Sequence, residues 1–291
     1  MQRWTPRVTD LAGGLQVRRA LPVAARRSVG PFVFFDHFGP VTLPAEADTD
    51  IGPHPHIGLA TVTYLFEGAF MHRDSLGTVQ EIRPGAVNWM TAGRGIVHSE
   101  RTPDAQRGQP RRMHGLQLWV ALPDDAEQAE PSFQHVAAEA IPELEADGAT
   151  VRVLLGRAFG VESPVATASP TLYLDIELPA GLPWTLPRLA EEMAVYSPLE
   201  CIELDGEVLP EGEMALVEGA EGAVLRSALA TRVVVVGGMA LPPRVIWWNF
   251  VASDRALIEQ AAERWSRGDF DKIPGEQGAL LMPPRPLHPG V

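Results

Sequence analysis

Glycine and proline interrupt this chain at short intervals, and this punctuation constrains its fold more than any other feature. The 291 residues include 27 glycines and 27 prolines, which are spread along the chain rather than gathered in one linker. The runs between them are short and rich in β-branched and aromatic residues. Frequent turns with few long helical patterns favour an all-β protein.

The first half of the chain contains several runs with strand composition. They are residues 61–66 (TVTYLF), 86–92 (AVNWMTA), 96–100 (IVHSE) and 114–122 (HGLQLWVAL), each close to a glycine or proline turn. Strands that recur about every ten residues, with turn signals between them, are typical of a sandwich or barrel. We therefore predict antiparallel β-structure of that kind.

The second half repeats this pattern, with strand-like runs at 171–178, 194–204 and 232–238. Such a repeat indicates a weak internal duplication. An acidic stretch that ends in proline, residues 124–131, lies between the two halves. We predict a domain boundary there, with one domain at 1–130 and a second at 131–291.

One segment near the C-terminus has a clear helical pattern. Apolar residues recur at i, i+3 and i+4 within residues 253–267, Ser253 and Asp254 can cap the N-terminus, and Gly268 can end the helix. The tail that begins at Pro274 is rich in proline and glycine. We expect that tail to be extended packing or partly disordered.

Charge and cysteine content narrow the functional classes. The chain has 24 Lys and Arg against 37 Asp and Glu, a net charge of -13, which argues against direct nucleic-acid binding. The single cysteine, Cys201, excludes an intrachain disulfide and is interpreted as a small buried apolar residue. No window approaches the roughly 18 consecutive apolar residues of a membrane span, so we expect a cytoplasmic protein without a membrane partner.

Two short motifs carry metal-ligand chemistry, His54-Pro55-His56 and His98-Ser99-Glu100. Residues i and i+2 of a strand face the same side, so each motif can direct two side chains at one point. Three imidazoles and a carboxylate suit Fe(II), Mn(II), Ni(II), Cu(II) or Zn(II) better than calcium or magnesium. Because a chain of this length needs no metal to fold, we expect the metal to be functional.

Other candidate residues have simpler interpretations. His72 is expected to be a hydrogen-bonded strand histidine or an orienting residue behind the ligands, and Trp89 a core residue. His37 either lines a groove near the site or packs within its turn. Where the duplication would place a second histidine pair, the chain has Leu186-Pro187-Arg188, so only the first half should carry the metal.

Several longer motifs resemble the pirin family of the cupin superfamily. They are GPFVFFDHFG (30–39), HPHIG (54–58), HRDSLG (72–77) and the run from Arg83 to Glu100. The resemblance implies a bicupin, two antiparallel β-barrel (jelly-roll) domains, with metal in the N-terminal one alone. Matched position by position, the ligands are His54, His56, His98 and Glu100.

The resemblance leaves more than one function open. The first hypothesis is a metal-dependent dioxygenase of the quercetin 2,3-dioxygenase type. It would use Fe(II), O₂ and a small flavonol-like or other aromatic enediol substrate, with Glu100 as the catalytic base. The alternative is a non-catalytic, redox-sensitive iron protein that regulates a protein partner. A third hypothesis keeps the metal for stability alone.

Overall fold

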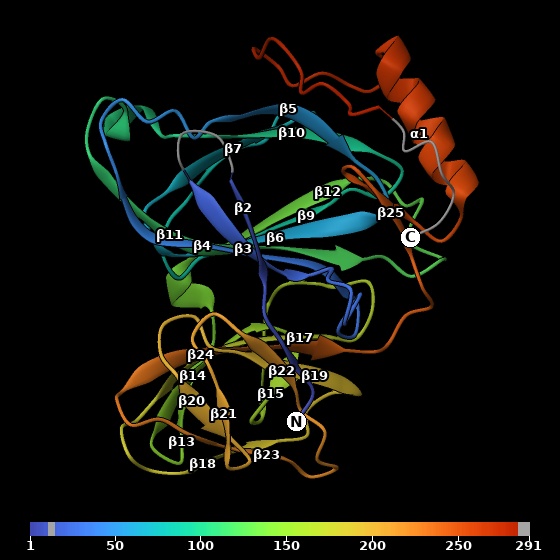
Figure 1. The fold of residues 1–291 in the computed structure, drawn as a ribbon. Coiled ribbons are helices and arrows are strands. Elements are labelled where there is room, and N and C mark those ends of the chain that lie inside the picture. The colour runs from blue at the N-terminus through green and yellow to red at the C-terminus, as the bar shows by residue number, and fades with distance from the viewer. Residues whose placement is uncertain (11–14, 285–291) are drawn as a thin grey trace.

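The computed structural model describes residues 1–10 and 15–284, and almost all of its regular elements are strands (Figure 1). The structure has two main sheets of seven strands and two of four strands. All neighbouring strands within these sheets pair in the antiparallel direction. The predicted all-β bicupin fold with a short C-terminal helix is therefore confirmed. Each half is a jelly-roll sandwich of two sheets rather than a closed barrel.

The first sandwich holds both candidate ligand motifs. Its seven-stranded sheet has the order β12-β9-β6-β11-β4-β3-β2, and its four-stranded sheet has the order β5-β10-β7-β8. The strand bounds are β2 (Arg7–Asp10), β3 (Gln16–Leu21), β4 (Phe32–Leu43), β5 (Ile51–His56), β6 (Leu59–Glu67), β7 (Phe70–Asp74), β8 (Val79–Ile82), β9 (Val87–Thr91), β10 (Ile96–Arg101), β11 (Arg111–Ala121) and β12 (Ser132–Val136).

The second sandwich has the same design, with sheets β1-β22-β19-β24-β17-β14-β13 and β18-β23-β20-β21. Its strands are β1 (Arg3–Trp4), β13 (Glu143–Ala146), β14 (Ala149–Leu155), β17 (Thr171–Leu178), β18 (Trp184–Pro187), β19 (Glu192–Tyr196), β20 (Ile202–Leu204), β21 (Glu207–Leu209), β22 (Met214–Leu216), β23 (Gly222–Arg226) and β24 (Thr231–Gly238). The remaining elements are β15 (Arg157–Ala158), β16 (Val161–Glu162), β25 (Val245–Trp247), β26 (Phe250–Ala252), the helix α1 (Arg255–Arg267) and 3₁₀ turns at Asp104–Gln106 and Ala138–Ala140.

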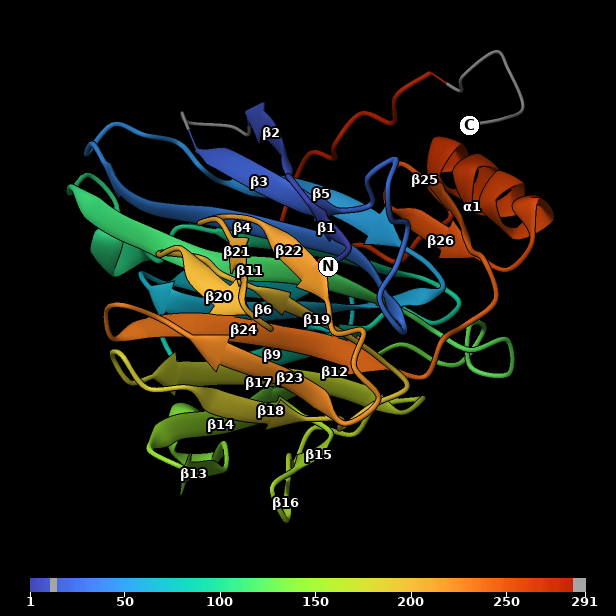
Figure 2. The ribbon, with the colours of Figure 1, turned by 60° about the horizontal axis from the view of Figure 1, so that its bottom comes forward.

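The two seven-stranded sheets face each other, so the four sheets lie in a stack (Figures 1 and 2). The largest buried cluster lies between these two sheets and joins both halves of the chain, for example Tyr64 and Trp89 with Tyr173 and Tyr196. Burying side chains of this size contributes about 1.5–3 kcal/mol each. Trp89 is 1% exposed, so its prediction as a core residue is confirmed.

Strand pairing crosses between the two halves at the chain's N-terminus and near residue 130. β1 pairs with β22 in the second seven-stranded sheet, and β12 pairs with β9 in the first. α1 packs on β25 and β26, and Arg264 donates a hydrogen bond to the carbonyl of Arg94 in the first sandwich. The division into domains at residue 130 stays a prediction.

The segment 194–204 was expected to be one strand, and that prediction is wrong. β19 ends at Tyr196 and β20 begins at Ile202. Ser197 is buried in the turn between them, where its hydroxyl donates to the carbonyl of Glu200. Proline at the next position cannot donate a ladder hydrogen bond, which explains why the strand stops. Cys201 lies in this turn and is exposed, so its interpretation as a buried residue is also wrong.

The predicted helix is confirmed as α1, together with its caps. The side chain of Asp254 accepts a hydrogen bond from the backbone nitrogen of Ala256, and Gly268 ends the helix in the left-handed region with φ 74°. Ile258, Ala261 and Ala262 form its buried face. Within residues 1–10 and 15–284, no helix has both the length and the apolar character to cross a membrane.

The bend that precedes β10 depends on Gly93, which has φ +51°. A Cβ atom at this position would lie 2.0 Å from the backbone oxygen of Ala129. We expect Gly93→Ala to lower the free energy of unfolding by at least about 2 kcal/mol, measured from urea unfolding curves. Gly77→Ala is the matched control. Gly77 has φ +87°, but a Cβ atom added there would meet no atom within 4 Å beyond its two chain neighbours. This substitution should cost only about 1 kcal/mol, and equal losses in the two variants would contradict the steric argument.

Candidate metal centre

The register of two strands brings the candidate ligands together. β5 and β10 are antiparallel neighbours, with His54 directly opposite His98 and His56 opposite Ile96. Side chains opposite each other on one face are close neighbours in an antiparallel pair. One ligand nitrogen from each of His54, His56 and His98 lies within 4.8 Å of the other two. The structure thus places three of the four predicted ligands in one cluster.

Backbone carbonyls orient two of the three imidazoles. His54 Nδ1 donates to the carbonyl oxygen of Gly52 at 2.9 Å, and His56 Nδ1 donates to that of Asn249 at 2.8 Å. A carbonyl can only accept, so these bonds place the proton on Nδ1 and leave a lone pair on Nε2. Metal-binding histidines are commonly held in this way.

His98 completes the cluster. Its Nε2 atom lies 3.1 Å from His56 Nε2. Its Nδ1 atom is buried and has no hydrogen-bond partner among the described residues. The Nε2 atom of His56 can only accept, so His98 Nε2 donates in this contact. Transfer of that proton to the unpartnered Nδ1 atom of His98 would free both Nε2 lone pairs for a cation. The donor set therefore fits a transition metal held by imidazoles.

Burial keeps the three imidazoles neutral, as metal ligands must be. Desolvation lowers the pKa of His54 to about 4. The same cause holds the pKa values of His56 and His98 well below 6.5, and the neighbouring histidines lower them further. At pH 7 these side chains can therefore offer lone pairs without first losing a proton.

Glu100 lies beside this cluster but is not part of the group whose ligand atoms all fall within 4.8 Å. The pairing of β10 with β5 shifts in register between His98 and Glu100, which brings Glu100 opposite Ile51. The pairing of β10 with β7 has no shift and places Glu100 opposite His72. Its carboxylate makes no hydrogen bond or ion pair with any described residue, and burial raises the pKa of Glu100 to about 7. Its assignment as a ligand stays a prediction.

A cavity of about 320 Å³, here called the site cavity, lies beside the cluster between the two sheets of the first sandwich. His54, His56 and Glu100 line one side. Phe34 and Trp119 line another, with stacked rings whose centroids are 4.1 Å apart. A buried cluster of this kind with aromatic walls has the features of a small-molecule site.

Comparison with known proteins identifies the chain's relatives. The family profile described as Pirin matches residues 14–120, and the profile described as Pirin C-terminal cupin domain matches residues 173–271. A pirin-like protein of Caulobacter vibrioides is 44% identical over 274 residues, covering 93% of this chain and 94% of the relative. This chain belongs to the pirin family.

Two further relatives of this pirin-family chain differ in their names. A crystal structure of quercetin 2,3-dioxygenase from Acinetobacter baumannii has 36% identity and a TM-score of 0.91, covering 99% of this chain and 97% of that one. Human pirin is 40% identical over 169 residues, or 58% of this chain and 55% of human pirin. The relatives of this chain therefore carry two different descriptions.

The other histidines of this pirin-family chain have structural partners. His72 Nε2 bonds to Asp74 Oδ2 at 2.9 Å and its ring stacks on Phe133, which confirms the prediction of a hydrogen-bonded strand histidine. His37 does not line the site cavity. Its two nitrogens contact Tyr196 Oη at 2.7 Å and His114 Nε2 at 2.9 Å, so it packs between the two seven-stranded sheets.

Several residues of the site cavity were not found from the sequence. The Arg19 guanidinium forms a bidentate pair with Asp36 at 2.8 and 2.7 Å and covers the ring of Phe34. Asn249 orients His56 from 193 positions away. Asp36 falls within the family motif at 30–39, but nothing local in the sequence connects Arg19 or Asn249 to the metal motifs.

In the second half of the chain, Leu186 and Pro187 lie on β18, where the duplication would place a histidine pair. Among residues 1–10 and 15–284, the three histidines of the first sandwich form the only cluster with metal-ligand geometry.

Proposed function

We propose that this pirin-family chain is a metal-dependent dioxygenase for a flavonol-like or other aromatic enediol substrate. The observation that carries the proposal is a cluster of three imidazoles beside a largely apolar cavity, which His54, His56 and the unpaired Glu100 line. The likeness to the A. baumannii quercetin 2,3-dioxygenase supports it. We assign His54, His56, His98 and Glu100 as the residues that hold the metal, and Fe(II) as the ion.

The residues that line the site cavity suit this substrate class. The stacked rings of Phe34 and Trp119 give an apolar wall, and an aromatic ring can pack against their edges. A cavity of about 320 Å³ accommodates a small polycyclic molecule while leaving little room for bulk water. Arg19 and Asp36 add a polar edge for substrate hydroxyl groups.

Glu100 is proposed as the base of the reaction. The residue is 8% exposed and lines the cavity, and its carboxylate makes no bond with a described residue, so it can accept a hydroxyl proton from a bound enediol. A metal bound by the histidines would supply Lewis acidity and electron transfer with O₂. The carbonyls of Gly52 and Asn249 keep two imidazoles in the required tautomer throughout.

Oxygen uptake tests the proposal. Metal-free protein is reconstituted separately with Fe(II), Mn(II), Ni(II), Cu(II) or Zn(II), and oxygen consumption is followed with quercetin. Luteolin is the matched control, because it lacks the 3-hydroxyl group of quercetin, and with it the enediol of the flavonol ring, but keeps the catechol ring. We expect uptake with quercetin that depends on a redox-active metal, and none with luteolin. Absence of uptake with every metal would refute the flavonol assignment and favour the non-catalytic regulator.

A further inference from the structure

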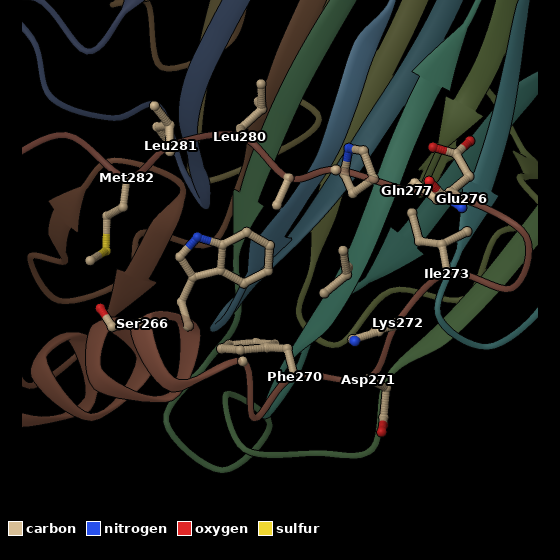
Figure 3. A pocket seen from close by; sticks show the side chains of 16 residues that line it. Ser266, Phe270, Asp271, Lys272, Ile273, Glu276, Gln277, Leu280, Leu281 and Met282 are labelled. Atoms are coloured by element: carbon tan, nitrogen blue, oxygen red, sulfur yellow. The ribbon is translucent and has the colours of Figure 1, made fainter.

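A second and larger cavity, of about 700 Å³, lies between α1 and the segment that follows it (Figure 3). We call it the helix cavity; its walls come from residues 265–273 and 276–282, with Pro53 and Val97 at its base. Successive residues of a strand face opposite sides, so Val97 faces this cavity while His98 faces the metal cluster. The helix cavity therefore lies behind the strand that carries the ligands.

Aromatic side chains give this cavity a firm apolar wall. Trp265 and Phe270 meet edge to face with centroids 5.8 Å apart, and Phe270 stacks on Phe250. The guanidinium of Arg264 lies 4.3 Å from the Phe270 ring centroid and holds it from another side. These contacts fix the wall before any ligand binds, which reduces the entropic cost of binding.

Apolar side chains at the rim remain in contact with water. Leu280 is 38% exposed and Leu281 is 93% exposed. Both belong to the extended segment after α1, which is fixed by the Leu280 amide bonded to the carbonyl of Pro53 at 2.8 Å. Exposed leucines beside an aromatic wall form a surface that an apolar ligand would cover.

Lys272 provides a positive charge at the helix cavity. It is the only lysine among the 291 residues, and its amino group points toward the cavity in Figure 3. It makes no hydrogen bond or ion pair within residues 1–10 and 15–284. The carboxylate of Glu276 is already held by Ser99 at 2.7 Å and Arg101 at 2.6 Å. Asp271 also lines the cavity, and its carboxylate points in a different direction from the Lys272 amino group in Figure 3. Lys272 is thus the only cationic side chain among the described residues that line the cavity.

We propose that the helix cavity is a second binding site, for a small aromatic carboxylate or similar aromatic anion. Its ring system would pack against Trp265 and Phe270, and its acidic group would pair with Lys272. The volume of about 700 Å³ lies within the range of small-molecule pockets. The proposal is independent of the dioxygenase assignment, because no residue of the imidazole cluster takes part.

Fluorescence titration of the full chain tests the site with two matched probes. 1-Anilinonaphthalene-8-sulfonate is an aromatic anion, and N-phenyl-1-naphthylamine has the same rings without the charge. Lys272→Met keeps the length of the side chain and removes its charge. We expect this variant to bind the anionic probe about 5- to 10-fold more weakly and the neutral probe unchanged. Arg226→Met, an exposed cation on β23, should bind both probes like the wild type.

A charge reversal at the rim makes the test independent of Lys272. Leu281 is exposed enough for Leu281→Glu and Leu281→Lys to fold normally. Relative to the wild type, Leu281→Glu should weaken binding of the anionic probe and Leu281→Lys should strengthen it. Equal affinity of the anionic probe for all of these variants, or parallel changes for both probes, would overturn the proposal.

The single lysine also allows the site to be located directly. An amine-acetylating reagent can modify only Lys272 and the Met1 amino group, which is paired with Glu207 at 2.9 Å. Peptide mass analysis follows the two rates separately. We expect the anionic probe to slow acetylation of Lys272 severalfold and leave Met1 unchanged. An unchanged Lys272 rate at saturating probe would overturn the proposal.

Discussion

His98→Gln is expected to lower the affinity for the metal by more than about 100-fold. Loss of a partner that only orients a ligand already costs roughly 10- to 100-fold, and this variant removes a ligand itself. His98 is 2% exposed and lies 3.1 Å from His56 through their Nε2 atoms, so no water or neighbouring side chain can easily replace its nitrogen. Metal content after dialysis and competition with a chelator give the measurement, and oxygen uptake should disappear with the metal.

His135→Gln is the matched control for that experiment. His135 is half-buried in the first sandwich and bonds to Asn88 at 2.7 Å, away from the cluster. It should bind metal as the wild type does. His54→Gln, at the more open wall of the cavity, gives a second test in case glutamine at position 98 impairs folding. Retention of a full equivalent of metal by both His54→Gln and His98→Gln would refute the proposed centre.

Alternation along a strand predicts the pairing of His54 with His56, but not the whole histidine cluster. The rule that residues i and i+2 share a face directs both His54 and His56 to one side of β5, and the structure confirms it. The pairing of β5 with β10 is not evident from the sequence. His56 and Ile96 lie opposite each other in this pairing, although 39 residues separate them along the chain. Long-range register depends on how whole sheets pack, and no local pattern encodes it.

Glu100 shows where the alternation rule weakens. A register shift follows His98, so the two-residue spacing alone does not establish that Glu100 joins the histidines. The carbonyl of Asn249 and the pair of Arg19 with Asp36 were likewise beyond prediction. They reach the site through folding of distant segments, and their residue types carry no metal signature of their own.

The turn at Ser197 illustrates a different failure. The run 194–204 has the composition of one strand, but the buried hydroxyl of Ser197 and the following proline end it after Tyr196. A proline marks a strand boundary, because it cannot donate within a ladder. The exposure of Cys201 follows from the same turn. The residues that form the turn, rather than the strand composition of the run, therefore determine where the strand ends.

Glu100→Gln is expected to lower the rate of oxygen uptake by about 10²- to 10⁴-fold, the usual contribution of a general base. Three imidazoles remain in this variant, so it should keep its metal better than His98→Gln does. Glutamine has nearly the same shape as glutamate but cannot accept the substrate proton. The two variants together therefore separate loss of the base from loss of the metal.

Two further variants test whether the loss of oxygen uptake is specific to the Glu100 carboxylate. Glu100→Asp keeps a carboxylate and should recover part of the rate. Glu67→Gln changes a carboxylate of the same sandwich that pairs with Arg112 at the surface, and it should leave turnover unchanged. A Glu100→Gln rate within a few fold of the wild type would refute the base role. Equal loss of metal from Glu100→Gln and His98→Gln would instead identify Glu100 as a ligand as essential as the histidines, because removal of its charge alone would then have emptied the site.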